Sequence, residues 1–101
     1  MAGAYEFLPI GHRVYKNIEN IIREEMDRAG YHEMLMTILT PRELWETTNR
    51  WDIPEYFKVP GWGNSEFRIA PTNEENVTSI FREFIQSYKD LPTCVYHIQK
   101  K

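Results

Sequence analysis

The chain has 101 residues, enough for one domain with one modest hydrophobic core. Its 42% hydrophobic and 14% aromatic residues exclude a disordered tail, and its net charge of −3 gives no sign of the basic face typical of small nucleic-acid-binding modules. The single cysteine, Cys94, excludes an internal disulfide and fits a reducing cytoplasm. Neither a secretory leader nor an apolar run of the roughly 18–20 residues that span a bilayer is visible.

The first predicted element is an amphipathic helix from about His12 to Ala29. Gly30 follows it as a suitable stop, and Pro9 precedes it. Apolar residues recur on one stripe with the spacing i, i+4, i+7, i+8, i+12: Val14, Ile18, Ile21, Ile22 and Met26. The charged residues off this stripe are expected to be solvated: Arg23, Glu24, Asp27 and Arg28.

A short apolar run, Met34–Leu39, predicts a strand buried on both faces, because it is too short for a typical helix. The next four residues, Thr40–Glu43, have the sequence of a capping box with proline at the first helical position. They predict a short helix that carries Leu44 and Trp45.

Asn49–Ser65 combines prolines and glycines with aromatic residues, so it predicts turns that pack onto the rest of the fold. Phe57–Val59 and Glu66–Ala70 are expected to form the two arms of a hairpin, with Pro60–Asn64 as its turn.

Thr72–Glu75 has the sequence of a second capping box. Helical spacing of apolar residues from Val77 to Tyr88 predicts a second long helix, which Lys89–Pro92 ends. Val95–Gln99 then predicts a strand that runs to the end of the chain, which suggests a longer parent polypeptide. Together these elements predict an α/β fold with two long helices packed on a largely antiparallel sheet.

The junction at Thr72–Glu75 is the richest place for chemistry, because helix N-termini offer free amides and partial positive charge. Glycine-rich phosphate loops are absent, and the histidines lack the spacing of a zinc site. If Glu75 serves the capping box, Glu74 is left over. Glu74 either only favours the helix dipole, or flanks a pocket with Thr72 and pairs with a cationic amine or imine nitrogen.

Gly3–Gly11 has the pattern G-x-Y-x-x-L-P-x-G, and Pro71–Glu75 has the pattern P-T-x-E-E. The first resembles the G-x-Y-x-x-L-P-L-G segment of the prolyl-tRNA synthetases, a family of class II aminoacyl-tRNA synthetases, and the second resembles that family's proline-recognition loop. Further matching segments lie in the same order: Arg23–Met26, Glu43–Trp45, Asn49–Trp51, Ser87–Pro92 and Tyr96–Lys101. The resemblance covers essentially the whole chain and implies the N-terminal part of a class II catalytic core.

The resemblance also implies roles for individual residues. Thr72 and Glu74 would contact the substrate proline, with Glu74 at its imino nitrogen. Motif 1, which packs in the dimer interface of the family, would include Met34, Leu35, Met36, Thr37 and Pro41. Thr37 stands where the family usually has the motif 1 proline, and it restores a backbone donor there.

For the parent enzyme, the resemblance implies a cytoplasmic homodimer that uses ATP and Mg²⁺ to activate proline and then transfers it to tRNA(Pro). Residues 1–101 would be a partial catalytic domain that ends before the motif 2 arginine, without motif 3 or an anticodon-binding domain. No catalytic residue and no metal ligand is identifiable in this chain, and nothing in it supports ATP or Mg²⁺ binding by the chain alone.

Three interpretations of the chain's own role stay open. It is a catalytically incomplete piece of the enzyme, a non-catalytic interaction module that keeps the motif 1 contacts, or a small-ligand-binding module that keeps the proline pocket. Proline binding without ATP–pyrophosphate exchange would single out the last.

Overall fold

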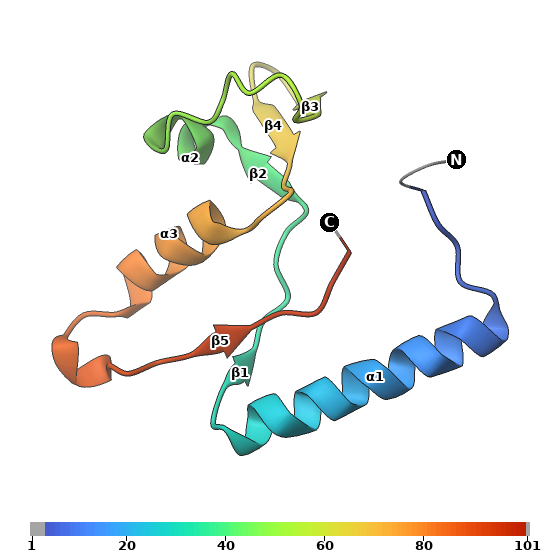
Figure 1. Ribbon diagram of the computed structural model, residues 1–101. Helices are drawn as coiled ribbons and strands as arrows, with labels where there is room; N and C mark the ends of the chain where they lie inside the picture. The colour runs from blue at the N-terminus through green and yellow to red at the C-terminus, as the bar shows by residue number, and fades with distance from the viewer. Residues whose placement is uncertain (1–3, 101) are drawn as a thin grey trace. The chain divides into compact units, whose positions relative to one another are not determined.

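The computed structural model describes residues 4–100 and has the α/β fold that the sequence predicts. Figure 1 shows the elements, which follow in this order: α1 (Pro9–Arg28), β1 (His32–Glu33), β2 (Leu39–Pro41), α2 (Arg42–Thr47), β3 (Lys58–Pro60), β4 (Glu66–Ile69), α3 (Glu74–Phe84), the 3₁₀ turn η1 (Tyr88–Asp90) and β5 (Val95–Tyr96). The chain divides into two compact units. Of the described residues, unit 1 comprises 4–34 together with 94–98, and unit 2 comprises 35–93 together with 99–100.

In unit 1, the long helix α1 begins and ends where the local sequence provides the signals. Pro9 occupies the first helical position, where its missing N–H is not needed. At the other end, the Gly30 N–H donates to the Asp27 carbonyl (2.9 Å) and the Tyr31 N–H to the Met26 carbonyl (3.0 Å). This is a Schellman motif, and Gly30 takes the positive φ of 80° that it requires. The predicted stop at Gly30 is confirmed.

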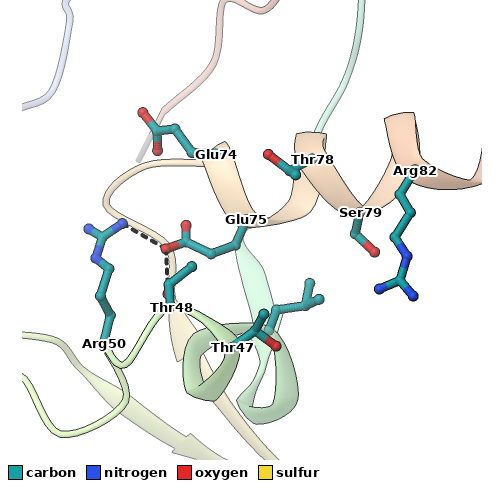
Figure 2. Close-up of a pocket in the computed structure, with 9 residues that line it drawn as sticks. Thr47, Thr48, Arg50, Glu74, Glu75, Thr78, Ser79 and Arg82 are labelled. Carbon is teal, nitrogen blue, oxygen red and sulfur yellow. Dashed lines mark hydrogen bonds and ion pairs between the residues drawn. The ribbon is translucent and has the colours of Figure 1, made fainter. Parts of the chain in front are cut away.

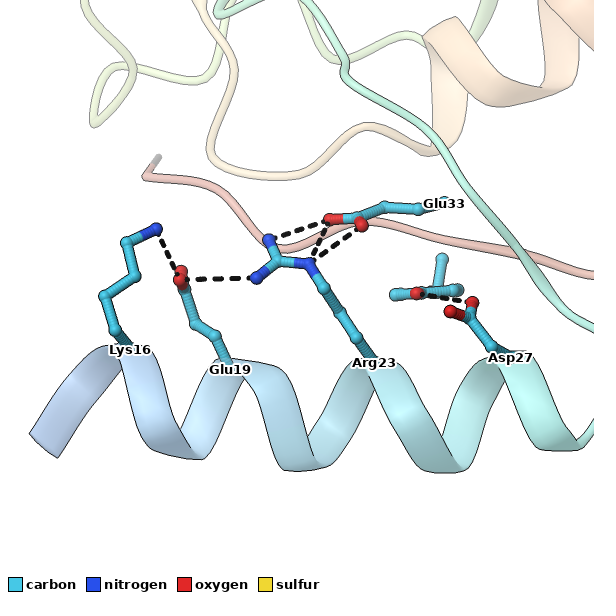
Figure 3. A network of polar contacts seen from close by, with 6 residues as sticks. Lys16, Glu19, Arg23, Asp27 and Glu33 are labelled. Carbon is cyan, nitrogen blue, oxygen red and sulfur yellow. Dashed lines mark hydrogen bonds and ion pairs between the residues drawn. The ribbon is translucent and has the colours of Figure 1, made fainter.

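The face of α1 that contacts the rest of unit 1 is polar, which corrects the sequence prediction (Figure 3). Arg23 makes hydrogen bonds to both carboxylate oxygens of Glu33 on β1, and the Tyr96 hydroxyl on β5 donates to Asp27 at 3.0 Å. Glu19 is buried, while the apolar stripe is exposed at Ile18 and other positions. The reason is that β1 and β5 present a carboxylate and a phenol to the helix, which match its charged side.

The strands of unit 1 are short and pair in parallel, with His32 opposite Val95 and Glu33 opposite Tyr96. The predicted strand Val95–Gln99 is confirmed only for its first two residues. Gln99 belongs to unit 2, where its side-chain amide bonds the backbone N–H and carbonyl of Met36 at 2.8 and 3.2 Å.

Unit 2 contains a three-stranded antiparallel sheet in the order β2-β4-β3. The predicted hairpin is confirmed, with its first arm at Lys58–Pro60 rather than Phe57–Val59. Its turn brings the Gly61 N–H to the Ser65 carbonyl at 2.9 Å. A Cβ on Gly61 would lie 2.6 Å from the Phe67 ring, so any other residue there would have to displace that ring. Because the β1–β5 pair is parallel, the predicted largely antiparallel arrangement is only partly confirmed.

The predicted buried strand Met34–Leu39 is wrong. Only Met36 in this run is buried, whereas Leu35 is 89% exposed, and regular strand begins at Leu39. The predicted capping box at Thr40 is also wrong, because Thr40 lies inside β2 and Pro41 occupies the N-cap position of α2. The Thr40 hydroxyl is fully buried and accepts from the Asn76 side chain on α3 at 2.6 Å. The Thr40 hydroxyl therefore bonds a buried side chain far along the sequence in place of a backbone N–H of α2.

The core of unit 2 is aromatic. Trp45 on α2 is fully buried, and Trp51 and Ala70 lie with it, while Tyr56 packs against this cluster. Replacing a buried aromatic side chain with alanine typically costs about 3–5 kcal/mol, so this small cluster carries much of the stability of the unit. Arg68 on β4 is also fully buried, stacked over the Trp51 ring at 4.8 Å, and its guanidinium donates to the Ile53 carbonyl.

The second helix, α3, has 11 residues and ends at Phe84, earlier than the periodicity to Tyr88 predicts. A capping box does occur in the chain, but at Ser87–Asp90, where it begins η1. There the Asp90 carboxylate accepts from the backbone N–H groups of Gln86 and Ser87 at 3.0 and 2.9 Å. These bonds favour a new turn over continuation of α3.

Candidate functional site

A pocket of about 350 Å³ lies between α2 and α3, entirely within unit 2 (Figure 2). Its walls come from α2, from the residues just after it, and from one side of α3 between its first and last turns. The lining residues are Leu44, Thr47, Thr48, Arg50, Glu74, Glu75, Thr78, Ser79 and Arg82.

Glu74, one of the two residues expected to contact proline, begins α3 and lines this pocket. Thr72, the other, lies two residues earlier in the connection from β4 and is not among the lining residues. Its hydroxyl is buried and has no hydrogen-bond partner within the described part of the chain. A buried hydroxyl without a hydrogen bond destabilises the folded state unless a ligand or a water molecule bonds it. The Thr72 hydroxyl is therefore a candidate ligand contact, two residues before Glu74.

Glu75 does not have the capping role that the sequence predicts. The N-cap position of α3 is Asn73, and no side chain caps the helix there. The Glu75 carboxylate instead accepts from the Thr48 hydroxyl at 3.0 Å and from the Arg50 guanidinium at 2.7 Å. Both partners in the Glu75–Arg50 bond are charged, whereas in a reciprocal cap only the carboxylate is, so the bond to Arg50 is the stronger one. The hydrogen-bond partners of the Glu75 side chain therefore lie 25 and 27 positions away in the sequence.

Arg50 is the functional-site residue that sequence reasoning missed. Its guanidinium donates to Glu75 and to the Tyr56 hydroxyl, both at 2.7 Å, and lies 5.1 Å from the centre of the Trp45 ring. The hydrogen bonds to Tyr56 and Glu75 raise the pKa of Arg50, so it stays charged. The only signal in the sequence was its place in Asn49–Trp51, one of the segments of the family resemblance.

The two ends of the pocket differ in charge. Glu74 and Glu75 lie at one end, and the guanidinium of Arg82 lies further along α3, as Figure 2 shows. Thr47, Thr78 and Ser79 contribute hydroxyl groups to the rest of the wall. Arg50 also lines the pocket and pairs with Glu75, so Glu74 gives that end its net negative charge. A small ligand with a cationic nitrogen suits that end.

The predicted motif 1 residues do not line this pocket: Met34, Leu35, Met36, Thr37 and Pro41. Thr37, at the position of the family's usual proline, bonds locally. Its hydroxyl lies 3.1 Å from the Leu39 amide nitrogen and 2.9 Å from the Leu39 carbonyl oxygen. These bonds fix the bend that leads into β2, which is a role that a proline fulfils by restricting φ.

Among residues 4–100, no group of three or more histidine, cysteine, aspartate or glutamate side chains is placed to hold a metal ion. Glycine-rich phosphate loops are absent from the sequence too. No helix in the described range combines the length and apolar character needed to cross a membrane.

Solved structures with this fold include aminoacyl-tRNA synthetases of class II. The RNA binding domain of threonyl-tRNA synthetase from Cryptosporidium parvum matches 96% of the chain and 24% of its own length, with a TM-score of 0.86 at 22% sequence identity. Prolyl-tRNA synthetase from Giardia lamblia, in complex with prolyl-adenylate, matches 96% of the chain and 21% of its own, with a TM-score of 0.84 at 24% identity. The fold is thus that of a segment of a class II synthetase.

Within this class, comparison of sequences shows that the chain is similar to the synthetases that act on proline. Proline–tRNA ligase from Fusobacterium nucleatum is 49% identical over 102 aligned positions, and that from Persephonella marina is 51% identical. Each match covers 99% of this chain and 18% of the ligase. No protein-family model matches the chain. Over nearly its whole length, the chain is a relative of one segment of the proline–tRNA ligases, which confirms the resemblance stated from the sequence.

Proposed function

We propose that this chain forms part of the proline-activating catalytic domain of a proline–tRNA ligase. The observation that carries the proposal is the 49% identity to such a ligase across 99% of the chain. The complete reaction joins proline to ATP as prolyl-adenylate, releases pyrophosphate, and passes the prolyl group to tRNA(Pro) in the cytoplasm. In the complete domain, both long helices are expected to pack on a largely antiparallel sheet.

Within this function, Glu74 is proposed to pair with the cationic imino nitrogen of proline, and Thr72 to hydrogen-bond the amino acid. Support comes from the position of Glu74 in the pocket wall and from the buried, unsatisfied hydroxyl of Thr72. A carboxylate–ammonium contact that is removed from water is worth about 1.5–3 kcal/mol.

The chain alone is proposed to bind proline without completing the reaction, because it spans only 18% of the ligases it matches. Should the chain act by itself, the 350 Å³ pocket favours the alternative of a small-ligand-binding module over a purely structural piece.

The test has two measurements on the purified 101-residue chain. Calorimetry should detect proline binding that a Glu74→Gln variant weakens by about tenfold to a hundredfold, the factor that about 1.5–3 kcal/mol represents. Proline-dependent ATP–pyrophosphate exchange should stay at background in both proteins. Unchanged proline binding in Glu74→Gln would remove the assigned role of Glu74, and robust exchange that this variant abolishes would show the chain to be complete.

We further propose that motif 1 forms a homodimer contact through Leu35 and its neighbours. Leu35 is 89% exposed, although leucine side chains usually lie inside folded proteins. The support is the motif 1 resemblance of this segment, together with the exposure of the apolar residues Leu35, Ile38 and Leu39 close together in the sequence.

A further inference from the structure

Arg50 is one of three residues, with Thr48 and Thr40, whose side chains bond the first turn of α3. One nitrogen of its guanidinium donates to Glu75, and another donates to Tyr56, each at 2.7 Å. The planar group lies over the Trp45 ring at 5.1 Å and the Tyr56 ring at 5.6 Å. One side chain therefore joins α3 to the aromatic core of the unit.

The Glu75 side of this contact is buried and firmly held. The side chain of Glu75 is 3% exposed, and the Thr48 hydroxyl makes a second bond to the same oxygen that Arg50 contacts. Figure 2 shows Glu75 directed at Arg50 and Thr48, while Glu74 points away from this cluster. Consecutive residues on a helix differ in direction by about 100°, so holding Glu75 fixes the direction of Glu74.

We propose that Arg50 is a positioning residue: through Glu75 it fixes the rotation of the first turn of α3, and thereby the placement of Glu74 and the Thr72–Asn73 connection. That the ligand of this site is proline rests on the proposed function. The positioning role of Arg50 rests on the contacts of its side chain alone. Arg50 itself is not assigned a contact with proline.

Arginine is suited to this role in a way that lysine is not. Its planar fork presents several N–H groups, so it bonds Glu75 and Tyr56 together while it stacks on an aromatic ring. In an Arg50→Lys variant, the ammonium would keep a charge near Glu75 but lose the stacked, two-partner geometry. The lysine variant is thus expected to retain part of the effect that an uncharged side chain removes.

Hydrogen exchange of the chain provides the direct test of position. The Val77 N–H donates to the Asn73 carbonyl at 2.9 Å and reports on the first turn of α3, while the Ile85 N–H donates to the Phe81 carbonyl at 2.8 Å and reports on its far end. In Arg50→Met, exchange at Val77 should rise about tenfold and exchange at Ile85 should stay unchanged. Arg50→Lys should give an intermediate rate.

Arg42→Met is the matched control. Arg42 also lies over an aromatic ring, that of Trp51, and its ion pairs are with Glu46 and Glu66, neither of which belongs to α3. Its replacement should leave exchange at Val77 unchanged. The positioning role is wrong if the Val77 amide of Arg50→Met exchanges at the rate measured in the unsubstituted chain. It is also wrong if amide exchange in this variant rises equally throughout the chain. The Asn76–Thr40 bond does not involve Arg50 and keeps α3 attached in its variants.

Proline binding separates this inference from the proposed function. Arg50→Met should weaken proline binding about tenfold, with Arg42→Met unchanged and Glu74→Gln as the reference. If Glu74→Gln weakens binding and Arg50→Met does not, the positioning inference is wrong. If the chain does not bind proline, or Glu74→Gln has no effect, the proposed function fails, and the exchange rates at Val77 still decide the role of Arg50.

Discussion

At the scale of single residues, two adjacent glutamates at the start of α3 have different surroundings. Glu75 is buried and paired with Arg50, while Glu74 is exposed and lines the pocket. The sequence suggested this division, but it attributed the structural role of Glu75 to a local cap. The ion pair with Arg50 makes that role larger, because a charged hydrogen bond between protein groups exceeds most capping interactions.

Glu75→Gln should therefore lower the free energy of unfolding by about 1–2 kcal/mol, since a neutral amide keeps the shape but loses the charge that faces Arg50. Urea unfolding followed by circular dichroism measures this loss. Glu46→Gln is the control, because the Glu46–Arg42 pair is largely exposed and its loss should cost no more than about 0.5 kcal/mol. Equal losses in the two variants would contradict the importance of the Glu75–Arg50 pair.

At the scale of elements, the polar face of α1 shows how a helix is held when its neighbours are polar. Arg23 binds Glu33 on β1 at 2.8 Å, and the Lys16 ammonium binds the buried Glu19 at 2.8 Å. The hydrogen bond from Arg23 lowers the pKa of Glu33, and the hydrogen bond from Lys16 lowers the pKa of Glu19. The attachment of α1 to β1 is therefore sensitive to acid.

The sign of this dependence follows from the lowered pKa values. A carboxyl group whose pKa is lower in the folded state stabilises that state above its unfolded pKa, and the contribution is lost as the pH falls through the folded pKa. Carboxyl-carbon NMR should show Glu33 titrating below the ordinary glutamate pKa of about 4.3. Arg23→Gln should return that titration to the ordinary range, whereas Arg28→Gln should not, because Arg28 bonds Glu25 instead. A Glu33 titration indifferent to Arg23 would contradict the ion pair.

At the scale of the whole molecule, the chain leaves many large apolar side chains exposed among its described residues. They include Ile10, Val14, Ile18, Ile21, Leu35, Trp62 and Phe84. Three of them, Val14, Ile18 and Ile21, lie on one face of α1, and an exposed apolar surface of that kind is typical of a site that contacts further protein. This agrees with a chain that matches only 18% of its ligase relatives.

The chain should therefore self-associate at micromolar concentration, as sedimentation equilibrium can measure. If motif 1 forms the contact, Leu35→Gln should weaken association by about tenfold, since burying a leucine side chain contributes about 1.5–3 kcal/mol. Trp62→Gln removes a side chain that is 97% exposed in the β3–β4 turn and serves as the control. A single monomeric species, or equal effects of the two variants, would contradict dimerisation through motif 1.

The sequence by itself determined the features that depend on neighbouring residues. It located α1 and its stop at Gly30, the β3–β4 hairpin with its turn, and Glu74 at the start of α3, because helix periodicity, positive φ and turn chemistry act over a few residues. The family resemblance came from the same local segments.

Only the tertiary structure decided which polar groups pair. Thr40 and Glu75 both have capping-box sequences, yet each bonds a partner 25 or more positions away, Asn76 and Arg50 respectively. A buried or charged partner offers a stronger bond than a local backbone amide, and folding alone brings it within reach. For the same reason, the spacing of residues in the sequence did not reveal the role of Arg50. It also did not reveal that α1 contacts β1 and β5 through its polar face.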